Sequence, residues 1–199
     1  MNVIFTADVY KKLRAYVLAI DTEIGLFGKV EKKGDVLFVS GLVLLSQQVS
    51  WGKTIIDRHA LDQFYLSLMD KGIDPSPWKC WIHSHATMKT FFSTTDEATI
   101  ESFDLEHPVD NWFLSIVVNH AGSLNARLDV FSPFRYTIGN LPWDVEFEDP
   151  KLIEEVQKEI AEKVVEIASP YGDGWEKWRE QLERMKRRRL PTQIILAKD

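Results

Sequence analysis

The sequence predicts an α/β sandwich around a mixed, mostly antiparallel sheet. Segments with apolar residues at helical spacing alternate with pairs of apolar runs that hairpin-like turns connect. Helices and hairpins follow one another irregularly, unlike the regular strand-helix-strand repeat of a doubly wound fold. The chain has 199 residues, of which 45% are hydrophobic, so it can bury one substantial core. We expect a compact domain at residues 1–149 and a C-terminal helical extension at 150–199.

The first part of the domain is expected to contain one helix and two paired strands. Apolar residues at helical spacing predict a helix over residues 7–20, with one face formed by Val9, Leu13, Val17 and Leu18. Residues 23–30 and 35–49 are rich in Val, Leu and Phe, as strands are. The Lys-Lys-Gly sequence at 32–34 predicts a turn that pairs them as antiparallel strands.

The middle of the chain predicts two more helices on either side of a buried strand. Asp57 can cap a helix that ends at Lys71-Gly72, and its apolar residues are Leu61, Phe64, Tyr65 and Leu68. Residues 78–85 form a short apolar run that is typical of a buried strand. The sequence Thr-Thr-Asp-Glu at 94–97 matches a capping box, which predicts a short helix through Phe103.

The last segments complete the expected sheet and then change in character. Residues 112–119 and 126–131 predict a hairpin of two further strands. After Asp149-Pro150, two amphipathic helices are expected on either side of the linker at 169–174, the first rich in Glu and the second in Lys and Arg. We expect these helices to pack as an antiparallel hairpin and to serve a homo-oligomer or a complex.

Composition excludes several classes of protein. No apolar run approaches the roughly 20 residues that a membrane span needs, and no signal peptide is recognisable, so we expect a cytoplasmic protein without a membrane partner. The single cysteine, Cys80, cannot form an internal disulfide and lies in an apolar run, where we expect a core residue. The net charge of −6 argues against nucleic-acid binding, and we interpret the basic run at 186–189 as a solvated helix end.

A metal site is predicted at the strand near residue 83. Side chains two apart in a strand point the same way, so His83 and His85 project from one face, and Ser84 from the other. Asp96 lies in the first turn of the next predicted helix. Two histidines and one carboxylate suit a catalytic Zn²⁺, which takes three protein ligands and leaves a fourth position for water. Attack on an amide also requires a carboxylate base.

The spacing of these residues resembles a known family. The sequence His83-x-His85, then ten residues and Asp96, with Ser93 three positions before the aspartate, is similar to the metal motif of the JAMM metallopeptidases, also called the MPN-plus or JAB-domain family. An upstream glutamate before a Gly-rich apolar strand is also typical of that family, and Glu23 precedes such a strand here. The resemblance covers roughly residues 5–135.

The resemblance implies a role for each of these residues. His83, His85 and Asp96 would be zinc ligands, Glu23 the general base, and Ser93 a hydrogen-bond donor to the developing oxyanion. The implied fold is the JAMM core, which is distantly related to the cytidine-deaminase layout. The implied reaction is hydrolysis of peptide or isopeptide bonds after the C-terminal glycine of ubiquitin or a ubiquitin-like modifier.

The chain departs from the family after the second histidine. The family commonly has proline there, whereas this chain has Ala86, which leaves the φ angle of the following loop unconstrained. Met88, Phe91 and Phe92 lie in this loop, where they either line a groove for an extended peptide or tuck beneath the loop. The three remaining histidines are expected to be surface or capping residues, namely His59, His107 and His120.

Other interpretations of the motif stay open. If His-Ser-His is coincidental, Asp96 only begins a helix. Within enzymes, the substrate could instead be a ubiquitin-like or sulfur-carrier precursor that is cleaved at a linear peptide bond. From another class, a non-catalytic MPN-type scaffold would bind partners without zinc. A nucleic-acid deaminase would require a downstream Pro-Cys-x-x-Cys, which this sequence lacks.

Overall fold

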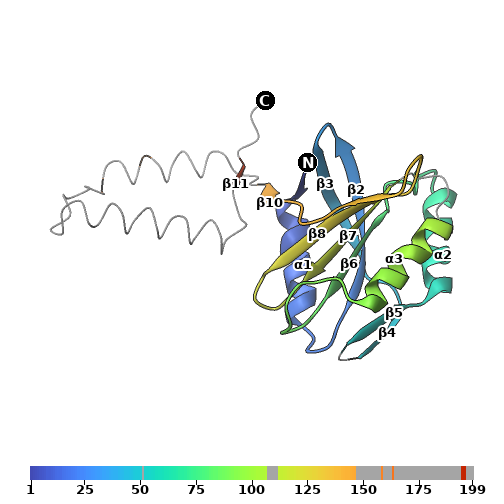
Figure 1. Cartoon of the computed structure of the whole chain (residues 1–199), viewed down its shortest axis with the longest axis horizontal. Coiled ribbons are helices and arrows are strands. Elements are labelled where there is room, and N and C mark those ends of the chain that lie inside the picture. Colours follow the sequence, from blue (N-terminus) through green and yellow to red (C-terminus); the bar gives the residue numbers. More distant parts are fainter. Residues whose placement is uncertain (51, 107–111, 147–157, 159–162, 164–193, 196–199) are drawn as a thin grey trace.

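A curled, mixed sheet with helices on both faces forms the described part of the molecule (Figure 1). The computed structural model describes residues 1–50, 52–106, 112–146, 158, 163 and 194–195. In spatial order the strands of the main sheet are β11 (Ile194–Ile195), β10 (Trp143–Glu146), β1 (Asn2–Phe5), β3 (Val36–Val43), β2 (Gly25–Lys33), β6 (Cys80–Ser84), β7 (Trp112–Val118), β8 (Leu124–Val130) and β9 (Tyr136–Ile138). A separate hairpin consists of β4 (Gln47–Ser50) and β5 (Lys53–Ile56). The helices are α1 (Ala7–Leu18), α2 (Arg58–Asp70) and α3 (Thr94–Glu106).

The expected mixed α/β class is confirmed, but the balance of strand directions differs from the prediction. Four of the eight pairings in the main sheet are parallel, so the sheet is not mostly antiparallel. Parallel neighbours require a crossover connection, and α3 supplies one between β6 and β7. β1 was not predicted, and it contributes two further parallel pairings, with β3 and β10.

The core has two parts, one on each face of the sheet. On one face α1 packs its buried residues Val9, Leu13 and Val17 against alternate residues of the central strands. The prediction that Leu18 belongs to the same buried face is wrong, because Leu18 lies at the end of α1 and is 58% exposed. The opposite face carries an aromatic cluster under α2 and α3, formed by Phe27, Leu61, Trp81, Ile100, Phe103 and Phe113.

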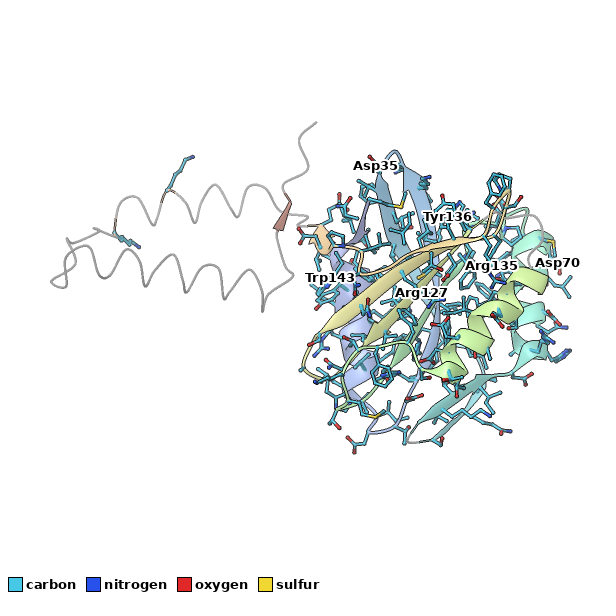
Figure 2. All side chains as sticks on the ribbon, viewed as in Figure 1. Asp35, Asp70, Arg127, Arg135, Tyr136 and Trp143 are labelled. Atoms are coloured by element: carbon cyan, nitrogen blue, oxygen red, sulfur yellow. The ribbon has the colours of Figure 1, made fainter. Side chains whose placement is uncertain are left out.

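Trp143 closes the α1 side of the core at β10. Its ring meets Phe5 edge-on with 6.3 Å between centroids, and it lies 5.7 Å from the Tyr10 ring on α1. Figure 2 shows this residue at the side of the sheet away from α2 and α3, while Arg127 lies on β8 among the side chains of the opposite half. The candidate site described below lies on the face of the sheet that α2 and α3 cover, since His83 stacks on Trp81 of the aromatic cluster.

Several short elements differ from the predicted boundaries. The expected strand at 35–49 is divided into β3 and β4, and β5, β9, β10 and β11 were not predicted. α2 begins as expected, since the Asp57 side chain accepts a hydrogen bond from the His59 backbone N–H at 2.9 Å. Strands of two to four residues carry too few side chains to show a periodicity, which explains why they escaped prediction.

Some expectations concern parts of the chain that are not described. The helical extension at 150–199 lies outside the described residues, apart from Lys158, Lys163 and β11. The same is true of His107 and of the basic run at 186–189. Among the described residues, no helix is both long enough and apolar enough to cross a membrane.

Candidate metal centre

Two histidine side chains converge at the end of β6, on the face that α2 and α3 cover. The His83 ring stacks on Trp81 with 4.2 Å between ring centroids, and both residues are buried. Cys80 and Ile82, which alternate with them, pack in the cluster on the α1 face. The Nε2 atoms of His83 and His85 lie 3.2 Å apart. Both imidazoles therefore present a nitrogen to the same point, as the alternation of a strand predicts.

Asp96 approaches this point from the first turn of α3. The Ser93 backbone N–H donates to Asp96 Oδ2 at 2.6 Å, and the Asp96 backbone N–H donates to Ser93 Oγ at 3.2 Å. These reciprocal bonds form a capping box at 93–96, with Ser93 as the N-cap and Asp96 at N3. The capping box expected at 94–97 is therefore wrong by one residue. Asp96 Oδ1 lies 3.1 Å from His83 Nε2, and Oδ2 lies 3.6 Å from His85 Nε2.

The three side chains have the spacing that a small tetrahedral ion requires. Zinc binds imidazole nitrogen and carboxylate oxygen at about 2.0–2.1 Å, which sets neighbouring tetrahedral ligand atoms roughly 3.3 Å apart. The separations among His83, His85 and Asp96 range from 3.1 to 3.6 Å. All three residues are buried and together form a group that could bind a metal ion. The donor atoms present thus fit a small divalent ion such as zinc.

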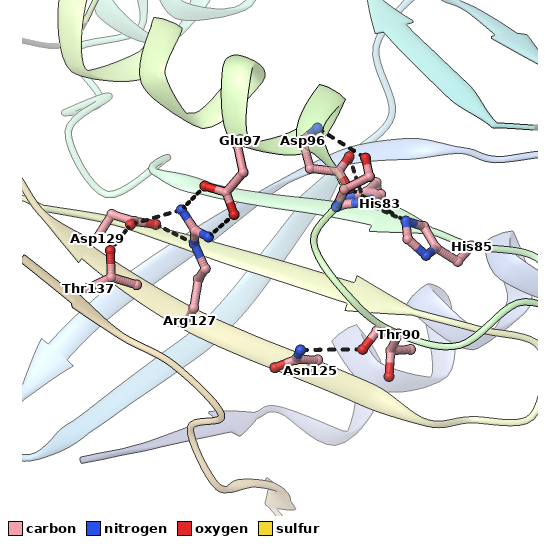
Figure 3. A network of polar contacts seen from close by, with 10 residues as sticks. His83, His85, Thr90, Asp96, Glu97, Asn125, Arg127, Asp129 and Thr137 are labelled. Carbon is pink, nitrogen blue, oxygen red and sulfur yellow. Dashed lines mark hydrogen bonds and ion pairs between the residues drawn. The ribbon is translucent and has the colours of Figure 1, made fainter.

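The environments of the two histidines shift their pKa values in opposite directions. His85 Nδ1 donates to the Lys89 carbonyl at 2.9 Å, which in the neutral ring leaves the lone pair on Nε2. Figure 3 shows the His85 ring directed at His83 and Asp96. Burial lowers the pKa of His83, against the opposing hydrogen bond to Asp96, and so favours the neutral imidazole. Burial also acts to lower the pKa of His85, but its contacts with Asp96, the Lys89 carbonyl and Glu23 outweigh burial, and the pKa is raised.

Asp96 is held as a carboxylate in spite of its burial. Removal from water acts to raise its pKa, but hydrogen bonds with His83, His85 and Ser93 prevail and keep the pKa well below the ordinary value. The helix start adds backbone N–H groups that favour negative charge at this position. A carboxylate and two imidazoles thus meet in one buried cluster.

The register of β2 against β6 places Glu23 beside the cluster. Gly25 pairs with His83 in this antiparallel ladder, so continuing the register sets Glu23 opposite His85. Glu23 is only 5% exposed, and its Oε1 lies 4.0 Å from His85 Nε2. Burial raises the pKa of Glu23, and Asp96 adds to this effect while His85 opposes it. Such a carboxylate takes up a proton more readily than an exposed glutamate does.

Two side chains that the sequence did not single out fix the segment around Glu23. Ser84 Oγ accepts a hydrogen bond from the Ile24 N–H at 3.0 Å, and the Ser84 N–H donates to the Ile24 carbonyl at 2.9 Å. The Gln47 amide accepts from the Gly25 N–H at 2.8 Å and donates to the Gly25 carbonyl at 2.9 Å. Gln47 thus takes the place of a neighbouring strand at Gly25, which local periodicity cannot reveal.

Replacing Ser84 with alanine tests this support. We expect Ser84→Ala to lower the free energy of unfolding by about 1–3 kcal/mol, because the Ile24 N–H loses its side-chain acceptor in a buried site. Urea denaturation measures the loss. Ser67→Ala is the control, since the Ser67 hydroxyl donates to the Phe64 carbonyl within α2, and it should change stability by less than about 0.5 kcal/mol. Equal effects of the two variants would show that Ser84 does not secure this segment.

The loop after His85 begins with a left-handed residue. Ala86 has φ of 44° and is buried, a conformation that the proline common in JAMM sequences cannot adopt. The loop is nevertheless tied to the β7–β8 hairpin. Asn119 Nδ2 donates to the Met88 carbonyl at 2.8 Å, and Asn125 Nδ2 donates to the Thr90 carbonyl at 3.3 Å (Figure 3). Side-chain hydrogen bonds thus define the path of this loop without the ring of a proline.

The three apolar residues of the loop occupy different environments. Phe91 is 50% exposed, and its ring meets the His85 ring edge-on at 5.0 Å. Phe92 is partly buried and packs against the aromatic cluster under α2 and α3. Met88 is also partly buried. Each of the two alternatives for this loop therefore fits one residue. The exposed ring of Phe91 can contact a ligand, whereas Phe92 is tucked beneath the loop.

Among the described residues, His59, His120 and Cys80 are not part of the cluster. His120 is partly exposed at a turn, where its Nε2 bonds to the Ile20 carbonyl at 3.1 Å. His59 lies in the first turn of α2, as expected. Cys80 is fully buried in the core, and burial raises the pKa of its thiol well above the ordinary value. The expectation of a buried core cysteine is confirmed.

A cavity of about 400 Å³ lies between α2, α3 and β5, and it is lined by neighbours of the cluster but not by His83, His85, Asp96 or Glu23. Trp81, which stacks on His83, forms part of its wall, and so does Thr95, which precedes Asp96. Other walls are apolar, among them Phe27, Ile56, Leu61 and Phe103, while Lys53 and Arg58 add positive charge. Apolar walls with a few polar groups are typical of ligand-binding sites.

Comparison of the sequence with models of known protein families finds no match, and no curated protein matches it either. The buried cluster of His83, His85 and Asp96 and the adjacent Glu23 are therefore the features on which a function can be proposed.

Proposed function

We propose that this chain is a zinc-dependent peptidase of the JAMM type, with the α/β sandwich layout of that family. One observation carries the proposal. Two imidazoles and a carboxylate stand at zinc-ligand spacing, and a second buried carboxylate, Glu23, lies 4.0 Å from one of them. A structural zinc site commonly has four protein ligands, whereas three ligands and a nearby base are typical of hydrolytic zinc.

His83, His85 and Asp96 would hold the ion. When bound, zinc lowers the pKa of a coordinated water and polarises the scissile carbonyl. The residues of the chain then provide the rest of the chemistry. Glu23, with its raised pKa, accepts the proton of the attacking water and returns it to the leaving amine. A buried position keeps this carboxylate close to the reaction and away from bulk solvent.

Ser93 is the proposed donor to the developing oxyanion. Its Oγ accepts the Asp96 backbone N–H, so the hydroxyl hydrogen stays available to donate. A preorganised donor of this kind typically contributes about 3 kcal/mol of transition-state stabilisation. Its place at the helix cap fixes the hydroxyl next to a metal ligand, which is the preorganisation that the role demands.

For the substrate we propose ubiquitin or a ubiquitin-like modifier, cleaved after its C-terminus, with the reaction taking place in the cytoplasm. The exposed ring of Phe91, which contacts the His85 ring, and the cavity lined by Trp81 and Thr95 offer apolar contacts. These features suit an extended peptide. We also propose that the C-terminal segment at 150–199 serves a homo-oligomer or a complex.

The experiment that tests this function uses the zinc-loaded full chain. It is incubated with lysine-linked di-ubiquitin, with linear fusions of ubiquitin-like proteins, and with C-terminally extended sulfur-carrier precursors. Cleavage by the wild type and not by Glu23→Gln supports a peptidase, and the substrate that is cut separates deconjugation from precursor processing. A purified protein without stoichiometric zinc and without cleavage would favour the non-catalytic scaffold.

Phe91 allows a separate prediction about substrate binding. We expect Phe91→Ala to raise KM about fivefold to tenfold at nearly unchanged kcat, because it removes an apolar contact worth roughly 1–1.4 kcal/mol. Thermal unfolding should be unaffected, since the ring is half exposed. Phe134→Ala, at a residue that is 79% exposed, is the control. An unchanged KM would remove Phe91 from the substrate site.

A further inference from the structure

Arg127 on β8 joins two carboxylates from different elements. Its Nη1 and Nη2 donate to the two oxygens of Glu97 at 2.5 and 2.8 Å, which forms a bidentate pair with α3. Its Nε and Nη2 donate to Asp129 at 2.9 and 3.1 Å. The Thr137 hydroxyl of β9 donates to the same Asp129 at 2.6 Å. Figure 3 shows this network beside the cluster of His83, His85 and Asp96.

The strand register explains why the network lies under α3. Asn125, Arg127 and Asp129 alternate with apolar residues along β8, so they share one face of the sheet. Arg127 of β8 pairs with Ser115 of β7, and Ser115 in turn pairs with Trp81 of β6. The guanidinium therefore stands on the same face as His83, two strands away.

Arg127 holds the polypeptide on both sides of the Ser93–Asp96 cap. Glu97, its partner on α3, directly follows the proposed metal ligand Asp96. On the other side, the Arg127 guanidinium carbon lies 4.8 Å from the centre of the Phe92 ring, and Phe92 directly precedes Ser93. The side chains of Arg127 and Asp129 are only 12% and 7% exposed, so their ion pair is shielded from water, whereas the Glu97 side chain is 46% exposed.

We propose that Arg127 is a positioning residue for the metal centre, which fixes Asp96 at ligand distance by clamping Glu97 and Phe92 on either side of the helix cap. This inference rests on the proposed metal site. A guanidinium suits the task because its planar fork fixes both distance and orientation of a carboxylate. The Asp129 carboxylate and the Thr137 hydroxyl orient the fork in turn.

A role confined to stability predicts a different outcome from a positioning role. If Arg127 only attached α3 to the sheet, its loss would lower the stability of the metal-free protein and leave the intrinsic metal affinity of the folded protein unchanged. If it positions Asp96, the metal affinity falls and the coordination geometry loosens. Metal binding by the folded protein therefore separates the two roles without reference to peptidase activity.

The test compares Arg127→Lys and Glu97→Gln with the wild type by zinc competition against a chromophoric chelator and by the absorption spectrum of the Co²⁺ form. Arg127→Lys keeps the charge and loses the fork, whereas Glu97→Gln changes a side chain that is 46% exposed and should fold normally. We expect both to weaken zinc binding about tenfold, the low end of the effect of partners that orient metal ligands, and to alter the Co²⁺ spectrum. Glu101→Gln, at an exposed position of α3, is the control and should match the wild type.

Two results would overturn the proposal, and they can be told apart. A wild-type protein that binds neither zinc nor Co²⁺ would remove the metal centre and the proposed function together. Zinc affinities and Co²⁺ spectra like those of the wild type in both variants would leave the metal centre in place and exclude Arg127 as its positioning residue. If Arg127→Lys fails to fold, Glu97→Gln alone decides.

Discussion

Replacing Glu23 with glutamine is expected to lower kcat by about two to four orders of magnitude, the range typical of losing a general base. The amide keeps the size of the side chain but cannot accept the proton of the attacking water. Glu23 is not among the three proposed zinc ligands, so the zinc content of Glu23→Gln should equal that of the wild type. Turnover of the best substrate and metal analysis of the same sample measure both quantities.

Glu31→Gln is the matched control for this experiment. Glu31 lies near the end of β2, the strand that begins two residues after Glu23, and it forms an ion pair with Lys29 at 2.9 Å. Its substitution should leave both turnover and zinc content unchanged. Turnover by Glu23→Gln at the wild-type rate would show that another group accepts the proton.

Asp96→Asn is expected to abolish stoichiometric zinc binding. The substitution replaces the single anionic ligand of the cluster with a neutral amide and leaves two imidazoles to hold a divalent ion. Affinity should fall by more than the roughly 10–100-fold that the loss of an outer partner of a metal ligand costs. Zinc analysis after dialysis against a weak chelator measures the loss, and peptidase activity should disappear with the metal.

The control for Asp96→Asn is Asp62→Asn on the exposed side of α2. It introduces the same chemical change away from the cluster and should retain zinc. If Asp96→Asn kept one zinc per chain, the ion would have to bind elsewhere, and the assignment of His83 and His85 as its ligands would fail as well.

The sequence was informative about the cluster because each of its parts is local. Alternation in the strand at 78–85 predicts that His83 and His85 share a face, and a helix start near residue 94 places Asp96 in a first turn, where a carboxylate is favoured. The family resemblance implied that Glu23 belongs to the site, and the antiparallel register of β2 and β6 explains why Glu23 lies beside His85. Only the exact cap residue of α3 differed.

The rest could not be predicted, because it depends on contacts between distant segments. Gln47 bonds to the Gly25 backbone across 22 positions, and Arg127 bonds to Glu97 across 30. Polar residues alternate along β8 in the sequence, which was a usable sign that Arg127 faces the sheet surface, but nothing local names its partner. The parallel pairings of β1 likewise depend on the order in which strands assemble.

The backbone at Ala86 affects how this chain should be compared with proteins of similar motif. An alignment by residue would set Ala86 against a proline, yet φ of 44° and the ring of proline exclude each other. In the turn that directly follows His85, equal positions in two such sequences would therefore occupy different points in space. Superposition on the imidazole nitrogens and the aspartate oxygens, and not the count of residues between them, would give the correct correspondence of this turn.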